Sequence, residues 1–137
     1  MAKMIFVNLP VSDLKKSTAF YTGMGAKINP QFSDDTASCM VFSDSIHAML
    51  LTHAKWATFS NKPIADAHRA SEVHIALSAE SRDEVNAITE AAGKAGGTAD
   101  IDPPQDHGFM FGRSFEDPDG HIWEVVWMDP AALPPNT

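Results

Sequence analysis

The sequence predicts an α+β fold in which the order strand, helix, strand, strand, strand occurs twice. Three observations predict it. Short apolar runs rich in β-branched and aromatic residues, which favour strands, are separated by turn residues. Two longer stretches place apolar residues at helical spacing and end in glycine. The second series of elements repeats the order of the first. At 137 residues, 44% of them hydrophobic, the chain has the size of one domain, residues 1–137, with a substantial core.

The first module is predicted over residues 4–53. Its opening strand is expected to end at Pro10, because proline donates no hydrogen bond to a sheet. Ser12 or Asp13 then caps a helix that runs to about Met24, where glycines end it. The four strands of this module are expected at 4–9, near 26–32, at 37–43 and at 46–53.

Residues 54–70 mix aromatic and charged side chains without a sustained period. We interpret them as a connecting segment that includes a short helical turn. A long connection inside a compact protein is often a lid or a binding loop, and it is equally compatible with a plain linker.

The second module is predicted over residues 72–128. Ser81 and Glu84 fit a capping box, and the helix that they begin is expected to end near Ala95. The proline-rich residues 129–137 form a tail. The four strands of this module are expected at 72–77, 98–101, 109–115 and 122–128.

Charge and cysteine content restrict the partners and the compartment. Ten basic and eighteen acidic residues give a net charge of −8, which argues against nucleic acid or an anionic membrane and is compatible with a neutral or cationic small molecule. Cys39 is the single cysteine, so no intramolecular disulfide forms, as suits a reducing cytoplasm. The sequence has neither a signal peptide pattern nor a run long enough to span a membrane. We therefore expect a cytoplasmic protein.

Glu124 is the residue that most needs a functional explanation. It follows a turn that Pro118 and Gly120 favour, and it lies within the apolar strand 122–128. A carboxylate with such neighbours is costly to bury unless it is paired, protonated or bound to a cation. His74, on the first strand of the same module, is the second candidate.

Taken together, these features resemble the vicinal oxygen chelate superfamily, which contains glyoxalase I, extradiol dioxygenases, and fosfomycin- and bleomycin-resistance proteins. The resemblance covers residues 4–128 and is strongest to bacterial proteins described as lactoylglutathione lyase-like. The motifs that carry it are Val11-Ser12-Asp13-Leu14 with Phe20-Tyr21, His74-Ile75-Ala76-Leu77, and the run from Phe115 to Glu124 through Asp117-Pro118-Asp119-Gly120-His121.

The resemblance implies a curved mixed sheet with a divalent metal at its centre. The glyoxalase pattern takes four ligands, at positions held here by Asn8, by Met49 or Leu50, by His74 and by Glu124. Neither Met49 nor Leu50 is an acid, so only the second pair is intact. A pattern of His, His and Glu departs from this chain at Asn8 alone, and the amide oxygen of Asn8 is a weak ligand for a transition metal. The implied metal ligands are therefore His74, Glu124 and Asn8, with Glu124 also the candidate catalytic residue.

Two functions follow from the resemblance. The first is a lyase or dioxygenase-type enzyme that depends on a divalent metal (zinc, nickel, manganese or iron) and has an incomplete ligand set. The second is a metal-free protein that sequesters a small molecule, as bleomycin-resistance members do. Glyoxalase chemistry uses a glutamate of the first module as its base, and this chain lacks it. Members of this length commonly form homodimers, sometimes with modules exchanged between subunits, and we expect a homodimer.

Several other polar and aromatic residues are expected to have ordinary structural roles. Arg113, in a strand near the last turn, is placed to pair with Glu124 or with an anionic ligand, but exposure is the default expectation. The aromatic side chains are expected mainly in the core or an interface, with Trp56 and Phe59 among the candidates for pocket walls. Surface positions are expected for His47, His53, His68, His107 and His121.

Overall fold

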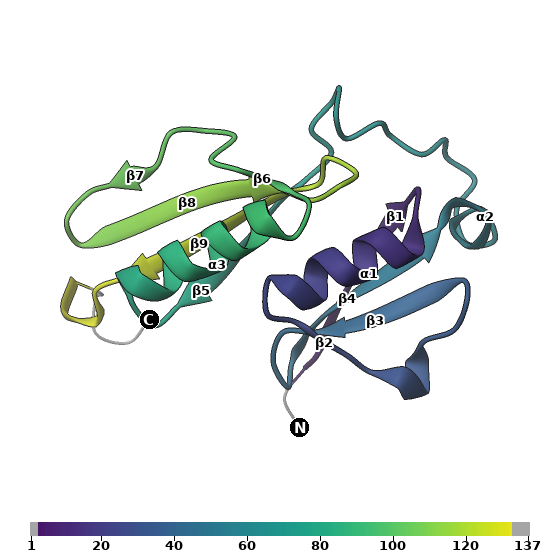
Figure 1. The fold of residues 1–137 in the computed structure, drawn as a ribbon, viewed down its shortest axis with the longest axis horizontal. Coiled ribbons are helices and arrows are strands. Elements are labelled where there is room, and N and C mark those ends of the chain that lie inside the picture. The colour runs from purple at the N-terminus through teal and green to yellow at the C-terminus, as the bar shows by residue number, and fades with distance from the viewer. Residues whose placement is uncertain (1–2, 133–137) are drawn as a thin grey trace.

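The computed structural model describes residues 3–132 and confirms the predicted α+β fold. Two modules lie side by side, each with one long helix packed across its strands (Figure 1). The strands form two open mixed sheets, one in each module. Within residues 3–132 no helix has the length and apolar character needed to cross a membrane.

The first module contains a four-stranded sheet in the order β1-β4-β3-β2, with β1 and β4 parallel. Pro10 does not end β1, contrary to the prediction, because β1 is an edge strand where a missing N–H is tolerated. The strand expected near 26–32 is shortened, because Asn29 caps a 3-10 helix that begins at Pro30. The elements are β1 (Ile5–Val11), α1 (Leu14–Gly23), β2 (Lys27–Ile28), η1 (Pro30–Phe32), β3 (Ala37–Val41), β4 (Ile46–Thr52) and α2 (His53–Trp56).

The second module contains the order β5-β9-β8-β6, with β7 also paired to β8. Ser81 caps α3 as predicted, its hydroxyl oxygen accepting the Glu84 N–H at 3.1 Å. The short strand β7 was not predicted. Residues 133–137 of the expected tail lie outside the described residues. The elements are β5 (His74–Ala79), α3 (Arg82–Lys94), β6 (Thr98–Ala99), β7 (Gln105–Asp106), β8 (Met110–Glu116), β9 (Ile122–Met128) and η2 (Pro130–Ala132).

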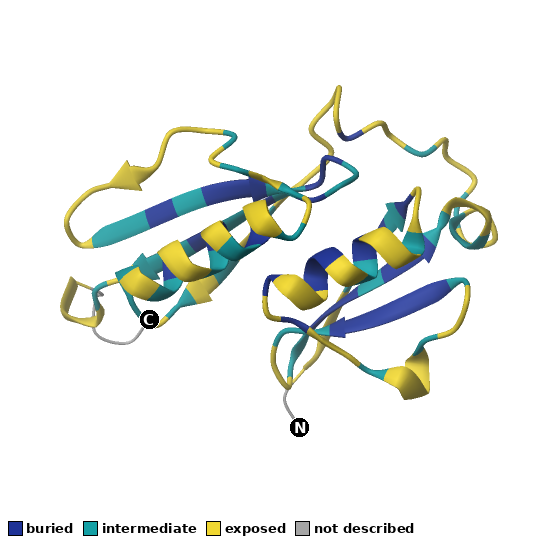
Figure 2. Ribbon diagram, viewed as in Figure 1, coloured by how far each residue is buried: buried dark blue, intermediate teal, exposed yellow. Residues whose placement is uncertain are grey.

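One hydrophobic core joins the two modules. Phe20 and Tyr21 of α1 pack with Phe115 and Trp123 of the second sheet, and all four side chains are fully buried. The Tyr21 and Trp123 rings lie edge to face, with centroids 5.7 Å apart. Burial of each such side chain stabilises the fold by roughly 1.5–3 kcal/mol. The helix-facing side of each sheet is thus occupied by the core, and the connecting segment between the modules is mostly exposed (Figure 2).

Candidate functional site

His74 and Glu124 lie on neighbouring strands of the second sheet. The parallel register of β5 and β9 pairs His74 with Ile122 and Ala76 with Glu124. Because side chains alternate along a strand, His74 and Glu124 are diagonal neighbours on one face. That face is opposite to the helix-facing side, where Trp123 and Val125 are buried in the core.

Both side chains line one cavity of about 350 Å³. One wall is the segment 102–105, which leads into β7. Ser114 of β8 pairs with Glu124 across the sheet, and its hydroxyl oxygen accepts the Asp102 N–H at 3.1 Å, which holds the start of that wall. Gly112 lines the cavity without a side chain. The predicted pair of candidates is therefore brought together in a hollow suited to a small molecule.

Within the described part of the chain, no basic side chain neutralises the carboxylate of Glu124. Arg113 also lines the cavity, but its guanidinium is bound on the helix-facing side to Asp100 at 2.7 Å and to Glu90 at 2.8 Å. Only 11% of the Arg113 side chain is exposed, which corrects the prediction of an exposed arginine. Its hydrogen bond to Asp100 raises the pKa of Arg113 and lowers that of Asp100. The ion pairs among residues 3–132 involve neither His74 nor Glu124.

The third predicted ligand, Asn8, lies in a different cavity. Asn8 on β1 pairs with Met49 on β4, whereas His74 pairs with Ile122, two residues before Glu124. The first-module equivalent of Glu124 is therefore two residues beyond Met49, at Leu51. Leu51 lines the same cavity as Asn8. The register thus favours neither predicted alternative at this position, and it places no acid there.

The cavity of one chain offers ligand types that suit a divalent cation, but His74 and Glu124 are only two ligands. Imidazole nitrogen and carboxylate oxygen are ligands of zinc, nickel, manganese and iron, and His74 and Glu124 supply one of each. Catalytic centres use three protein ligands, and within residues 3–132 no group of three or more His, Cys, Asp or Glu side chains is placed to hold a metal.

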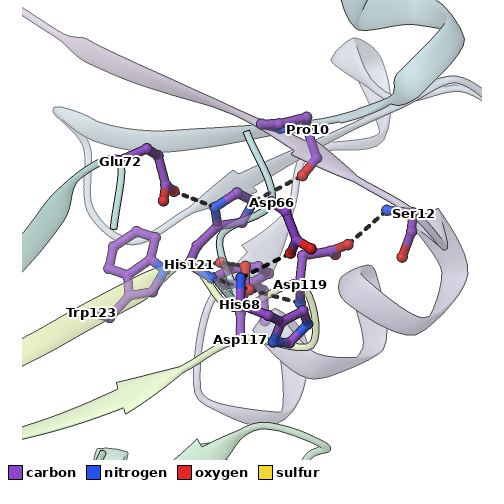
Figure 3. Close-up of polar contacts among 10 residues, drawn as sticks. Pro10, Ser12, Asp66, His68, Glu72, Asp117, Asp119, His121 and Trp123 are labelled. Atoms are coloured by element: carbon purple, nitrogen blue, oxygen red, sulfur yellow. Dashed lines mark hydrogen bonds and ion pairs between the residues drawn. The ribbon is translucent and has the colours of Figure 1, made fainter. Parts of the chain in front are cut away.

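The turn before β9, residues 117–121, makes polar contacts that join the two modules (Figure 3). His121, expected at the surface, is 2% exposed. Its Nδ1 lies 2.6 Å from Glu72 Oε1, and its Nε2 lies 2.8 Å from the carbonyl oxygen of Pro10. The Pro10 carbonyl oxygen can only accept, so Nε2 donates to it, and in the protonated ring Nδ1 donates to Glu72 as an ion pair. One side chain therefore connects β9, β1 and the residues that lead into β5.

Two aspartates of the same turn, Asp117 and Asp119, also bind residues of the first module. Asp117 accepts a hydrogen bond from the Tyr21 hydroxyl at 2.5 Å, and Tyr21 in turn accepts one from the Trp123 indole at 2.9 Å. Asp119 accepts the Ser12 N–H at 2.9 Å (Figure 3). Burial raises the pKa of Tyr21 well above 10 and also raises the pKa of Asp117. The Asp-Pro-Asp-Gly-His motif is thus a structural joint between the modules.

The joint predicts a pH dependence of stability. Burial lowers the pKa of His121, but Asp117, the Pro10 carbonyl and Glu72 together raise it above its ordinary value of 6.5. A raised pKa in the folded state means that this stabilisation is complete below pH 6.5 and is lost as the pH rises through the folded pKa. Urea unfolding at pH about 6 and about 9 should show a lower free energy of unfolding at the higher pH. The same loss in His121→Gln would contradict the assignment, since glutamine does not titrate.

Among the other histidines, the prediction fails at His47. It is 7% exposed and stacks on Phe6, with ring centroids 4.6 Å apart. His53, His68 and His107 are exposed, as predicted. Sequence reasoning also missed Gly112 and the wall 102–105, because only the pairing of β7 with β8 brings that segment over the cavity.

Comparisons with known proteins agree with this architecture. The family model of the Glyoxalase/Bleomycin resistance protein/Dioxygenase superfamily matches residues 3–125. No curated protein matches the chain. A hypothetical protein from S. aureus is 25% identical, with a TM-score of 0.76 over 93% of this chain and 94% of that one.

Two other solved structures share the fold at lower identity. A glyoxalase/bleomycin resistance protein/dioxygenase family enzyme from Burkholderia phytofirmans PsJN is 16% identical, with a TM-score of 0.74 over 93% of this chain and 99% of that one. A genomically encoded fosfomycin resistance protein from Listeria monocytogenes is 21% identical, with a TM-score of 0.65 over 93% of this chain and 91% of that one. At these identities the likeness concerns the fold alone.

Proposed function

The chain belongs to the Glyoxalase/Bleomycin resistance protein/Dioxygenase superfamily, and from that membership we propose that it is a glyoxalase-like protein that binds a small molecule in the His74–Glu124 cavity. The observation that supports this proposal is an imidazole and a carboxylate on one face of one hollow, neither of them in an ion pair with another described residue. Two such groups supply a donor, an acceptor and a negative charge for an incoming ligand.

We expect this cavity to bind a divalent metal together with the small molecule. His74 and Glu124 would hold it, with water or Asn8 of a second copy completing the shell. A bound divalent cation polarises a carbonyl oxygen of a ligand. The wall 102–105 would limit access of water to the cavity. The missing acid at Leu51 makes the standard two-glutamate mechanism unsuitable for this chain.

A homodimer fits the exposed edges of the two sheets. The edge strands β1 and β5 each have one side that pairs with no other described strand. Ile5, Phe6 and Val73, on or beside these strands, are large apolar residues with at least 40% of their surface exposed. Open apolar edges are usually covered in native proteins. A second copy of the chain placed there would explain them, and it could also bring its Asn8 towards the metal.

Titration of metal-stripped protein with zinc, nickel, manganese or iron(II) tests the proposal. Calorimetry should detect binding by the natural sequence and its loss in His74→Ala, because a single remaining carboxylate is a weak site. The control is His107→Ala, since His107 is exposed and lines no part of the cavity.

Unchanged metal affinity in His74→Ala, or an equal loss in His107→Ala, would remove the metal from the proposal. The metal-free alternative then applies: sequestration of a small molecule in the same hollow. It predicts that metal-stripped protein is stabilised against heat by an apolar or cationic compound, and that this effect does not require added metal.

A further inference from the structure

We infer that the hollow between the two modules, where α1 ends and α3 begins, is a binding site for a small amine that carries an ammonium group on an apolar body. The volume of this hollow is about 440 Å³. Five of the residues that line it belong to the first module and four belong to the second. None of them lines the His74–Glu124 cavity.

Both modules supply apolar walls to this hollow. The first contributes Met24, buried at the end of α1, and the half-buried Phe42 and Ile46 beside the turn between β3 and β4. The second contributes Leu77 of β5 and Ile88 of α3. Phe42, Leu77 and Ile88 pack against the shared core but are only partly buried. An apolar body between these walls would remove their remaining surface from water, which is favourable.

The hollow lies on the helix-facing side of the second sheet, opposite to the candidate metal site. Ala76 on β5 pairs with Glu124 on β9. Because side chains alternate along a strand, Leu77 points away from the face that carries His74 and Glu124. The inference therefore depends neither on the metal nor on the proposed function, and each can fail without the other.

Among the described residues that line the hollow, only Glu84 is charged. Its Oε2 accepts the Glu80 N–H at 2.9 Å, and its own N–H donates to the Ser81 hydroxyl oxygen, so the residue is held at the start of α3. Its Oε1 accepts no hydrogen bond from residues 3–132, and the ion pairs of that range do not include Glu84. The half-buried carboxylate thus has one oxygen available to a donor on a ligand.

These groups favour an amine over other small molecules. A carboxylate beside apolar walls is costly to desolvate unless a cation or a donor pairs with it. An ammonium group would give it a charge-assisted hydrogen bond, which is stronger than one between neutral groups. The net charge of −8 favours the approach of a cation. An anion would lie beside Glu84 without a basic partner in the wall.

Four compounds test the inference on the full chain without added metal. 2-Phenylethylamine has both features, 2-phenylethanol has the same body without the charge, 3-phenylpropanoate has a negative charge, and ethylamine has the ammonium group without the ring. Nuclear magnetic resonance should show saturable shifts at Ile46 and Ile88, hence in both modules, with 2-phenylethylamine. Each of the other three compounds should bind about tenfold more weakly, the value of one hydrogen bond to a charged group or of a comparable apolar contact.

Glu84→Gln tests the assignment of the carboxylate. Glutamine can still accept the Glu80 N–H but has no charge, so the fold should survive. This variant should lose the preference for 2-phenylethylamine over 2-phenylethanol. The matched control is Asp83→Asn, because Asp83 is an exposed acid in the same turn of α3 that does not line the hollow. The control should keep the preference.

Ile88→Ala tests the apolar wall. It should weaken the binding of 2-phenylethylamine and of 2-phenylethanol about fourfold, the value of one buried methylene group. Ile28→Ala should change neither, because Ile28 is 43% exposed and lines no part of the hollow.

Equal binding of 2-phenylethylamine and 2-phenylethanol by the natural sequence would overturn the inference, as would an equal effect of Glu84→Gln and Asp83→Asn. Binding that is lost in Glu124→Ala but unchanged in Glu84→Gln would place the amine in the second-module cavity. That result would also overturn the inference, while leaving the proposed function intact. Binding that persists in Glu124→Ala and weakens in Glu84→Gln is the expected result.

Discussion

Replacing His121 with alanine is expected to lower the free energy of unfolding by about 3 kcal/mol. The substitution removes both donors of the imidazolium, so the Glu72 carboxylate and the Pro10 carbonyl oxygen lose their hydrogen bonds at the joint between the modules. Breaking a buried pair by removing one partner leaves the other uncompensated. The partial exposure of Glu72, whose side chain is 27% exposed, places the effect at the lower end of the usual range. Urea unfolding at pH about 6 measures it.

His68→Ala is the matched control for this substitution. His68 is exposed, and its ring makes one hydrogen bond to the Pro118 carbonyl oxygen at 3.0 Å. Its loss should cost about 1 kcal/mol or less. Similar losses in the two variants would show that His121 is an ordinary turn residue and would contradict its assignment as the joint.

Gly120→Ala is expected to destabilise the fold by about 3 kcal/mol, from backbone strain and a clash together. Gly120 has a φ of +88°, in the left-handed region that side chains disfavour. A Cβ atom there would also lie 2.6 Å from the backbone nitrogen of His68 and 2.8 Å from the carbonyl carbon of Ala67. Backbone atoms cannot move aside as the end of a side chain can, so the connecting segment would have to separate from the turn.

Gly108→Ala isolates the contribution of the backbone alone. Gly108 has a similar φ of +81°, and a Cβ atom added to it would have no atom of another described residue beyond its chain neighbours within 4 Å. This variant should lose about 1–2 kcal/mol, the strain of a left-handed residue. Thermal or urea unfolding of both variants gives the comparison. An equal loss in the two would mean that the contact of Gly120 with Ala67 and His68 contributes nothing.

Local patterns predicted most of the fold. Ser81 with Glu84 marked the start of α3, and the apolar run 122–128 coincides with β9. The errors have local causes. Pro10 would end a central strand but is tolerated in an edge strand, and the sequence does not show which strand lies at the edge. Pro30 begins a 3-10 helix where a strand was expected.

The sequence predicted the site only where the alternation of side chains along a strand determines which residues share a face. His74 and Glu124 share a face because each lies on a strand with a buried side, and the pattern of apolar residues shows which side that is. The separation of Asn8 from them depends on how the modules meet. That meeting depends on His121, whose partners are 49 and 111 residues away along the chain. A local sequence pattern cannot predict contacts between residues that lie so far apart along the chain.

The joint and the candidate site are connected through the first residues of β5 and β9. Glu72 lies two residues before His74, and His121 lies three residues before Glu124. The ion pair between Glu72 and His121 therefore holds the first residues of β5 and β9 beside each other. Loss of the joint should disturb the spacing of His74 and Glu124 even where the fold survives.

The metal content of protein purified without a histidine tag, measured by elemental mass spectrometry, tests the central claim most directly. The natural sequence and Glu124→Ala are compared, each as purified and after incubation with nickel, zinc, manganese or iron(II). Near-stoichiometric metal in the natural protein that is lost in Glu124→Ala is the predicted result. Absence of metal from both proteins, or equal amounts in both, would contradict a metal-loaded His74–Glu124 cavity.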